Sequence, residues 1–294
     1  MGKILIAGCG YLGTELATSL VRLGREVIGL KRNITSLPPS IVPWSADLQN
    51  PLALNSLPND LTTVFFSAAP TSATEQTYRE TYLEGFGNLL TALERTKLER
   101  LFFCSSTSVY GQSAGEWIDE LSPTVPPSFT GKVMLEAEQL AKQAQFPTTV
   151  VRFGGIYGPG RDRLLNRIEE GLEPIPTVER YTNLIHRDDC VGVLIHLMNE
   201  RVDENLFLAV DDEPVSRVVL LEWLAYALEV KLRPSISLTA PPSERHLANK
   251  RCSNARLRAA GYQFRYPTFR DGYRSLLVER KTVKQTSDRV SSNL

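Results

Sequence analysis

Residues 4–13 read ILIAGCGYLG, a short apolar run followed directly by three glycines at the spacing GxGxxG. The run predicts a buried strand, and the leucines at 12, 16, 20 and 23 predict an amphipathic helix over residues 11–23. A glycine motif that ends a strand and opens a helix is typical of a dinucleotide site. Gly8 would make the turn, Gly10 would let a pyrophosphate approach, and Gly13 would let the helix pack closely. The free N–H groups at the helix start, around Tyr11 and Leu12, would meet the phosphate charge.

Further apolar runs continue this strand–helix pattern along the first half of the chain. They lack polar alternation, which is typical of parallel strands buried on both faces. Helical patterns at residues 77–96 and 131–144 separate them. The order predicts an α/β fold with a Rossmann-type, doubly wound parallel sheet. The predicted strands are residues 4–7, 26–30, 63–67, 101–105 and 148–153.

The pattern changes after residue 153, where a glycine-rich stretch begins. A helix over 187–199 and a strand over 205–210 are expected to return to the sheet. Further helices at 216–229 and 269–279 surround polar, proline-bearing connections such as 240–242. The sequence therefore predicts an NAD(P)-binding domain over residues 1–160, a smaller C-terminal substrate lobe over 161–280 with elements that return to the sheet, and a frayed polar tail over 281–294.

Charge and composition narrow the range of partners. Lys plus Arg and Asp plus Glu each number 33 among the 294 residues, so the formal net charge is zero. A neutral chain has no general field to attract nucleic acid or a membrane surface, and no run of about 18 apolar residues is present. The four cysteines form no CxxC pair, so neither a metal site nor a disulfide framework is expected. We expect reduced thiols and a cytoplasmic protein.

The residues after the second strand bear on the choice of cofactor. NAD-specific sites usually place an acid there to bind the ribose hydroxyls, whereas Lys31 and Arg32 stand at this point. These cations favour a 2′-phosphate, so NADP(H) is the preferred cofactor and NAD(H) the alternative. The alternative is that both are solvated loop residues. Asp47, in the segment SADL over residues 45–48, would either reach the adenine edge or cap the next turn.

Three later segments carry a resemblance to a known family. Residues 103–111, FCSSTSVYG, resemble the SS(S/T)xVYG segment of extended short-chain dehydrogenases/reductases, the NAD-dependent epimerase/dehydratase family. Residues 151–161, VRFGGIYGPGR, resemble its LRxxxVYGPG segment, and residues 183–189, NLIHRDD, resemble its NxIHVxD segment. With the glycine motif, four motifs keep the family order across about residues 3–275. The resemblance implies a Rossmann fold, a bound NAD(P) and a small-molecule substrate.

The family's catalytic set is incomplete in this chain. Its members use a Tyr as acid/base, a Lys four residues later that lowers the Tyr pKa and binds the nicotinamide ribose, and a Ser or Thr that hydrogen-bonds the reacting oxygen. The resemblance assigns Ser106 to the last role and Lys132 to the second. Four residues before Lys132 stands Ser128, which forms no phenolate, so the Tyr is missing. An unassisted Tyr titrates near pH 10 and needs such a cation to act as a base at neutral pH.

Other side chains are candidates to replace the missing Tyr or to bind the substrate. Tyr110 and Tyr157 are candidate proton donors, although a buried aromatic with a satisfied hydroxyl is the simpler reading of both. His186 and Asp188 are candidate general bases, but Asp188 is also placed to cap the helix that follows. Arg152 follows a strand and is expected to make structural hydrogen bonds. Three further cations are candidates for an anionic substrate group, each with solvation as the alternative, namely Arg161, Lys250 and Arg251.

Two functions follow from this pattern. The first is an NADP(H)-dependent oxidoreductase or epimerase/dehydratase-like enzyme acting on a small polar, sugar-like substrate. Gly155 weakens the case for a nucleotide sugar, because many such enzymes have Asn there. The second is a catalytically silent NADP(H)-binding sensor or regulatory protein. The family often dimerises through two helices, so a homodimer through residues 77–96 and 131–144 is also expected.

Overall fold

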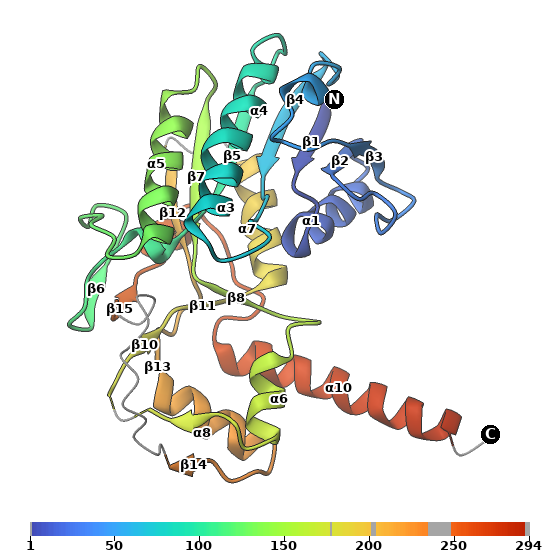
Figure 1. Ribbon diagram of the computed structural model, residues 1–294. Helices are drawn as coiled ribbons and strands as arrows, with labels where there is room; N and C mark the ends of the chain where they lie inside the picture. Colours follow the sequence, from blue (N-terminus) through green and yellow to red (C-terminus); the bar gives the residue numbers. More distant parts are fainter. Residues whose placement is uncertain (1, 177, 201–203, 235–247, 292–294) are drawn as a thin grey trace.

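In the computed structural model, a seven-stranded parallel sheet forms the centre of the chain (Figure 1). The structure describes residues 2–176, 178–200, 204–234 and 248–291. The strand order is β12-β7-β5-β4-β1-β2-β3, so the chain winds outward in both directions from β1. This order confirms the Rossmann-type sheet, and its switch point lies between β1 and β4. The strands are β1 (Lys3–Ala7), β2 (Val27–Lys31), β3 (Val42–Ser45), β4 (Leu61–Phe66), β5 (Arg100–Ser106), β7 (Thr148–Phe153) and β12 (Leu206–Ala209).

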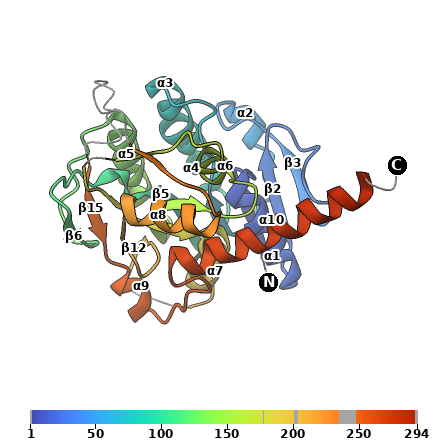
Figure 2. The same ribbon diagram turned by 90° about the horizontal axis from the view of Figure 1, so that it is seen from below.

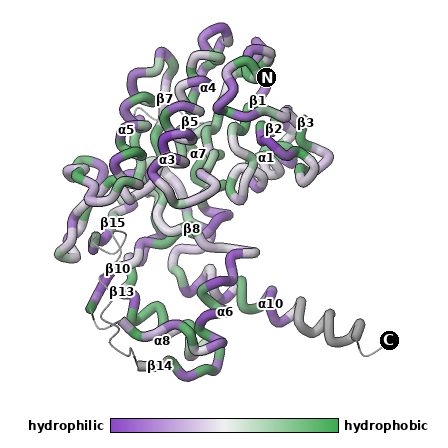
Figure 3. The backbone as a smooth tube through the Cα atoms, in the orientation of Figure 1, coloured by the Kyte–Doolittle hydropathy of each residue, from purple (hydrophilic) through white to green (hydrophobic). Residues whose placement is uncertain are grey.

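Helices cover both faces of this sheet. Ile4 and Ile6 of β1 share a core with α1 (Tyr11–Arg22) and α7 (Arg187–Asn199). Leu5 and Ala7, which point to the opposite face, share a core with α4 and α5. Because both faces are buried, the inner strands are mostly apolar, whereas the edge strand β3 is largely exposed. Apolar residues concentrate on the sheet in Figure 3. The helices of the second face are α2 (Pro51–Leu54), α3 (Glu75–Arg79), α4 (Phe86–Leu93) and α5 (Phe129–Gln143).

The helix that the sequence predicts over residues 77–96 consists of three pieces. Between α3 and α4 lies η1 (Glu80–Gly85), a segment with π-helical hydrogen bonding. A π-helical turn holds more residues than an α-helical one and therefore changes which side chains face the sheet. Such turns often occur at functional sites, and η1 borders the pocket described below.

A smaller lobe lies beyond the carboxyl ends of the sheet strands (Figure 1). Three helices surround its apolar core, α6 (Arg163–Glu169), α8 (Arg217–Ala227) and α10 (Phe269–Ser291). Short strand pairs, whose bounds the sequence did not predict, complete it and connect it to the body. They are β8 (Gly155–Tyr157) with β11 (Leu184–His186), β9 (Pro174–Ile175) with β14 (Arg233–Pro234), β10 (Tyr181–Thr182) with β13 (Val215–Ser216), and β6 (Glu116–Ile118) with β15 (Lys250–Cys252), followed by α9 (Ala255–Ala259).

The C-terminal segment differs from its prediction. The sequence suggests a helix to residue 279 and a frayed tail, whereas α10 continues to Ser291 and projects from the body (Figures 1 and 2). A polar stretch without an apolar stripe does not distinguish a solvated helix from coil. The connection at 240–242 lies outside the described residues. Across the described ranges, no helix combines the length and apolar character needed to span a bilayer.

Candidate functional site

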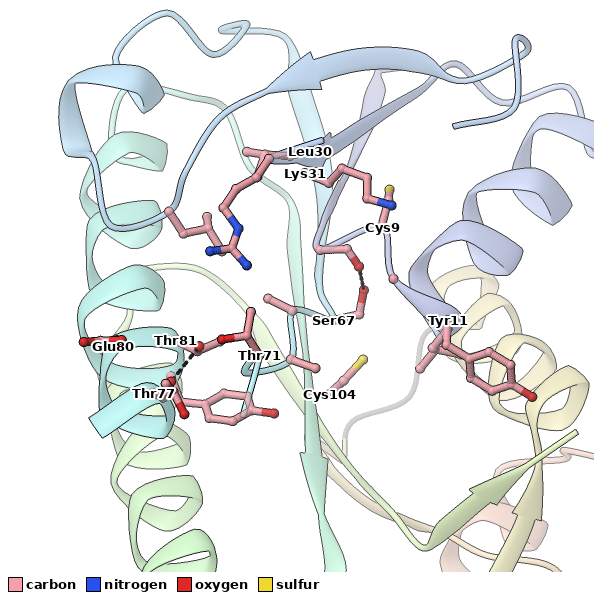
Figure 4. Close-up of a pocket in the computed structure, with 18 of the residues that line it drawn as sticks. Cys9, Tyr11, Leu30, Lys31, Ser67, Thr71, Thr77, Glu80, Thr81 and Cys104 are labelled. Carbon is pink, nitrogen blue, oxygen red and sulfur yellow. Dashed lines mark hydrogen bonds between the residues drawn. The ribbon is translucent and has the colours of Figure 1, made fainter. Parts of the chain in front are cut away.

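A cavity of about 610 Å³ opens at the carboxyl ends of the strands, on the side of the switch point (Figure 4). We call it the main pocket. The loops after β1, β2, β3 and β4 line it together with the end of β5 and with η1, and Ile156 and Arg161 reach it from the segment that leads into the smaller lobe. Ligands of open α/β sheets bind at this place, because the loops of neighbouring strands diverge there.

The glycine turn at one wall of the main pocket fits a pyrophosphate. Gly8 has φ of 102°, and a Cβ there would lie 2.3 Å from the backbone of Ala68, while a Cβ on Gly13 would lie 2.3 Å from the Gly8 carbonyl oxygen. Gly10 lines the pocket, and a Cβ there would meet no described atom within 4 Å. No side chain caps the start of α1, so its first N–H groups remain available to an anion, and Tyr11 and Leu12 both line the pocket.

Both cations predicted after β2 line the main pocket. The Lys31 Nζ lies 3.1 Å from the Ser36 Oγ and extends toward Cys9 in Figure 4. The Arg32 guanidinium makes no hydrogen bond or ion pair within the part of the chain that the structure describes. Asp47 also lines the pocket, and its Oδ1 accepts the Gln49 N–H at 3.1 Å, which closes a local turn. Both readings of Asp47 are therefore compatible with its position.

Arg161 adds a third cation at the opposite rim. Its guanidinium carbon lies 4.1 Å from the ring centroid of Tyr11, and its Nη1 donates to the Ile156 carbonyl at 2.7 Å. Arg187 lies on the same tyrosine ring at 5.3 Å. Lys250 and Arg251, by contrast, do not line the pocket, because they donate to the carbonyl oxygens of Tyr110 and Gly115.

The end of β5 places Ser106 and Cys104 in the main pocket. The Ser106 Oγ accepts the Ser108 N–H at 3.1 Å at the start of the short helix η2 (Thr107–Val109), and its own proton remains free to donate. Burial raises the pKa of the Cys104 thiol to about 12, so it is not a thiolate nucleophile at neutral pH.

Tyr110 does not reach the main pocket, which corrects its assignment as a catalytic candidate. Its side chain is fully buried, and its hydroxyl donates to the Asp119 carbonyl at 2.8 Å. The same hydroxyl accepts from Arg152 at 2.6 Å, and Arg152 forms a two-pronged ion pair with Glu138. Ser105 donates to the same carboxylate at 2.6 Å. Tyr110 and Arg152 therefore belong to a buried network that joins β5, α5 and β7.

Lys132 also lies outside the main pocket, which corrects its role as the ribose-binding lysine. It is exposed and borders a shallow groove with Val125 and Pro126, whereas Met134 is the residue of α5 that lines the main pocket. Positions two apart on a helix point about 200° from each other. The position four before Met134, on the same side of α5, is Thr130, so this face carries neither a phenol nor an ammonium group. Ser128 caps the helix through the Gly131 N–H.

Three buried polar atoms lie where β8 and β11 join the smaller lobe. The Tyr157 Oη, the His186 Nε2 and the Asp211 Oδ2 have no hydrogen-bond partner among the described residues. Burial raises the pKa of Asp211 to about 8 and lowers the pKa of His186 to about 4.

The residue that caps α7 differs from the prediction. His186, not Asp188, caps this helix by accepting the Asp188 N–H, so the expected cap is corrected.

The pocket also contains residues that the sequence analysis did not single out. Thr77, Glu80, Thr81 and Tyr82 line it from α3 and η1. Nothing in the sequence marks the π-helical turn that brings them there.

Within the described residues, no group of three or more His, Cys, Asp or Glu side chains is placed to hold a metal ion.

The fold and the glycine turn together define a class of protein. Residues 4–206 match the family described as NAD dependent epimerase/dehydratase, which is more than half of the chain. The chain belongs to this family, which confirms the resemblance seen in its motifs.

Relatives extend the comparison over almost the whole chain. A solved structure of an NAD-dependent epimerase/dehydratase from Methylobacillus flagellatus is 38% identical, covers 95% of this chain and 99% of its own, and has a TM-score of 0.80. A 3-diazoavenalumate denitrifying reductase of a Streptomyces species is 26% identical over 92% of this chain and 98% of its own. UDP-glucose 4-epimerase of Thermus thermophilus, solved with NAD, is 21% identical, covers 92% of this chain and 96% of its own, and shares the fold with a TM-score of 0.78.

Proposed function

We propose that this protein is an NADP(H)-dependent oxidoreductase that reduces a small polar carbonyl compound. One observation carries the proposal. A single pocket runs from the Arg32 guanidinium, which has no partner among the described residues, past the glycine turn to Ser106. The pocket thus combines a cation for a 2′-phosphate, backbone N–H groups for a pyrophosphate and a hydroxyl for a substrate oxygen. A named reductase among the relatives supports the reaction type.

Separate residues bind the cofactor and the substrate oxygen. The reduced nicotinamide, when bound, supplies the hydride. Arg32 binds the 2′-phosphate through two donors, and the N–H groups of Tyr11 and Leu12 bind the pyrophosphate. Ser106 donates a hydrogen bond to the substrate oxygen as negative charge develops on it. We propose that residues 1–160 perform this binding and that the lobe over 161–280 selects the substrate.

The composition of α5 favours a second candidate, an NADP(H)-binding sensor without turnover. Thr130 and Met134 occupy the side of the helix where a phenol and an ammonium would serve acid/base catalysis. The homodimer through residues 77–96 and 131–144 and the cytoplasmic location stay predictions.

Cofactor titration tests the binding half of the proposal. The dissociation constants of NADPH and NADH are measured by fluorescence for the natural protein, Arg32→Ala, Lys31→Ala and, as a control, Arg22→Ala on the last turn of α1. Arg32→Ala should lower the preference for NADPH over NADH about tenfold, equal to about 1.4 kcal/mol, because only NADPH carries the 2′-phosphate. Lys31→Ala should lower it less, since Lys31 already bonds Ser36. An unchanged ratio in both variants would contradict the assignment.

Turnover tests the catalytic half. Aldehydes, ketones and keto sugars are offered with NADPH, and the absorbance of the reduced nicotinamide is followed. Reduction that is lost in Ser106→Ala, with NADPH affinity retained, supports the oxidoreductase. Tight NADPH binding without turnover of any compound supports the sensor instead.

A further inference from the structure

Tyr82 presents a phenol to the main pocket from the π-helical segment η1. Its side chain is 7% exposed, and its ring packs against Phe66 at 6.4 Å and Tyr78 at 5.5 Å between centroids. Phe66 belongs to β4, so the ring is fixed between the sheet and the preceding helical turn. A ring held in this way places its hydroxyl at a defined point of the pocket wall.

The hydroxyl of Tyr82 is free to meet a ligand. It makes no hydrogen bond to any described residue, yet it is not among the enclosed unpartnered atoms, which include the hydroxyls of Tyr11 and Tyr157. The Tyr110 hydroxyl, in contrast, is occupied by Asp119 and Arg152. Tyr82 therefore differs from these three tyrosines in combining an unoccupied hydroxyl with access to the pocket.

Its neighbours place this hydroxyl at the Ser106 end. The Tyr82 phenol and the Cys104 thiol are close enough to interact electrostatically. Cys104 and Ser106, two positions apart on β5, point to the same side of the strand and both line the pocket. Met134 completes this wall. Two hydroxyl donors, from η1 and from β5, thus line the same cavity, and Cys104 links their positions.

We propose that Tyr82 is the catalytic proton donor of this protein, acting on the substrate oxygen that Ser106 holds. The inference rests on the proposed reductase function. It assigns the proton transfer to an element other than α5, whose pocket-facing side has no ionisable group in the residues named above.

The step balances as a carbonyl reduction. The carbonyl carbon receives a hydride from the reduced nicotinamide while the C=O double bond becomes single. The oxygen takes the proton of the Tyr82 hydroxyl, so the carbonyl is reduced to an alcohol and the nicotinamide is oxidised. The Tyr82 oxygen then recovers a proton from water that enters the open pocket. The transfer is favourable because an alkoxide is a stronger base than a phenolate.

The surroundings of Tyr82 favour carbonyl reduction over alcohol oxidation at neutral pH. Burial, and after it the neighbouring Tyr78 and Cys104, raise the pKa of the Tyr82 phenol, and no cation of the described residues lowers it. Tyr82 therefore stays protonated at neutral pH, as a donor requires. The reverse reaction would need the phenolate as a base, so alcohol oxidation should be slow at pH 7 and should accelerate as the pH rises.

The test compares Tyr82→Phe with Tyr78→Phe, a neighbouring tyrosine that does not line the pocket. For the carbonyl compound that the natural protein reduces best, Tyr82→Phe should lower kcat about 100-fold and leave the NADPH dissociation constant within twofold. Tyr78→Phe should retain kcat within about threefold. Circular dichroism of both variants verifies that they fold alike.

A second readout is independent of turnover. The protein is labelled with 3-fluorotyrosine, and the ¹⁹F resonance of Tyr82 is assigned by its loss in Tyr82→Phe. Adding NADPH should shift this resonance and leave that of Tyr110 in place.

The outcomes distinguish the role of Tyr82 from the reductase function as a whole. A shifted resonance with a large loss of kcat supports Tyr82 as the donor. A resonance that NADPH leaves unchanged, or a kcat within threefold in Tyr82→Phe, overturns that role and leaves the reductase function standing. Absence of NADPH binding or of any reduction by the natural protein overturns both.

Discussion

Arg161 and Lys132 show how two exposed cations of similar sequence appearance acquire different roles. Arg161 is aligned by the Ile156 carbonyl and by the Tyr11 ring, and it lines the main pocket. Lys132 lies on the outer side of α5. At the scale of single residues, charge alone therefore says little. What matters is whether backbone and ring contacts hold the charge toward the cavity.

This difference predicts the effect of removing each charge. Arg161→Ala should weaken NADPH binding about tenfold, because the pocket loses one of the three cations that line it. Lys132→Ala should leave the affinity within twofold. Fluorescence titration at low and high salt measures both, and the Arg161 effect should shrink as salt screens the charge. Equal losses in the two variants would restore Lys132 as a cofactor residue.

At the scale of elements, the rotation of α5 decides which of its side chains face the main pocket. Glu138 is fully buried and receives Arg152 of β7 and Ser105 of β5. These bonds fix the helix about its own axis, and Met134, one turn earlier, is directed to the main pocket. A match of one lysine to a family motif could not reveal this rotation, since the motif lacks its tyrosine.

Two glutamates of α5 provide a matched test of this anchoring. Glu138→Ala leaves the Arg152 guanidinium buried without its carboxylate and should cost about 3–5 kcal/mol of stability. Glu136→Ala removes a partner of Arg79 at a half-exposed pair and should cost less than about 1 kcal/mol. Urea unfolding followed by fluorescence compares them. Similar costs for the two would mean that the buried pair does not anchor the helix.

The elements themselves were largely predictable. Strands β1, β4, β5 and β7 and helix α7 lie within one or two residues of their predicted bounds, because each carries an unbroken apolar run or a clear helical period. The short pairs β8–β11 and β10–β13 were not, because strands of two or three residues are too short to show a period. The π-helical turn at η1 was not predicted either, because it shifts the helical register without changing the residue composition.

At the scale of the whole molecule, the junction of the two lobes contains buried ionisable groups. Asp211 follows β12 of the sheet, and Tyr157 and His186 end the paired strands β8 and β11. Tyr157 stacks on Tyr273 of α10 at 4.6 Å, so this junction also anchors the C-terminal helix. The stability of the arrangement should therefore depend on pH.

The direction of this dependence follows from Asp211. Its pKa is raised from 3.8 to about 8 on folding, so between these values the folded state holds a proton that the unfolded state has lost. Stability from this group is complete below pH 4 and is lost as the pH rises toward 8. Relative to Asp211→Asn, the natural protein should lose up to about 1.4 kcal/mol per pH unit across this window.

Urea unfolding of both proteins at several pH values measures the difference, and comparing the two removes the opposite contribution of His186. Its lowered pKa costs stability below about pH 6.5 in both proteins. Asp212→Asn, which removes the neighbouring carboxylate that pairs with Arg258, is the control. A flat difference between the natural protein and Asp211→Asn would show that Asp211 is ionised in the fold.

The sequence by itself determined the parallel sheet, the glycine turn of residues 8–13 and the family. These features are local, since a strand needs its apolar run and a tight turn needs its glycines. Only the tertiary structure decided which side of α5 faces the pocket, that Tyr110 is enclosed by Arg152 and Asp119, and that Tyr82 opens to the cavity. These depend on packing between segments far apart in the chain, where a rotation of one helix by half a turn exchanges a lysine for a methionine.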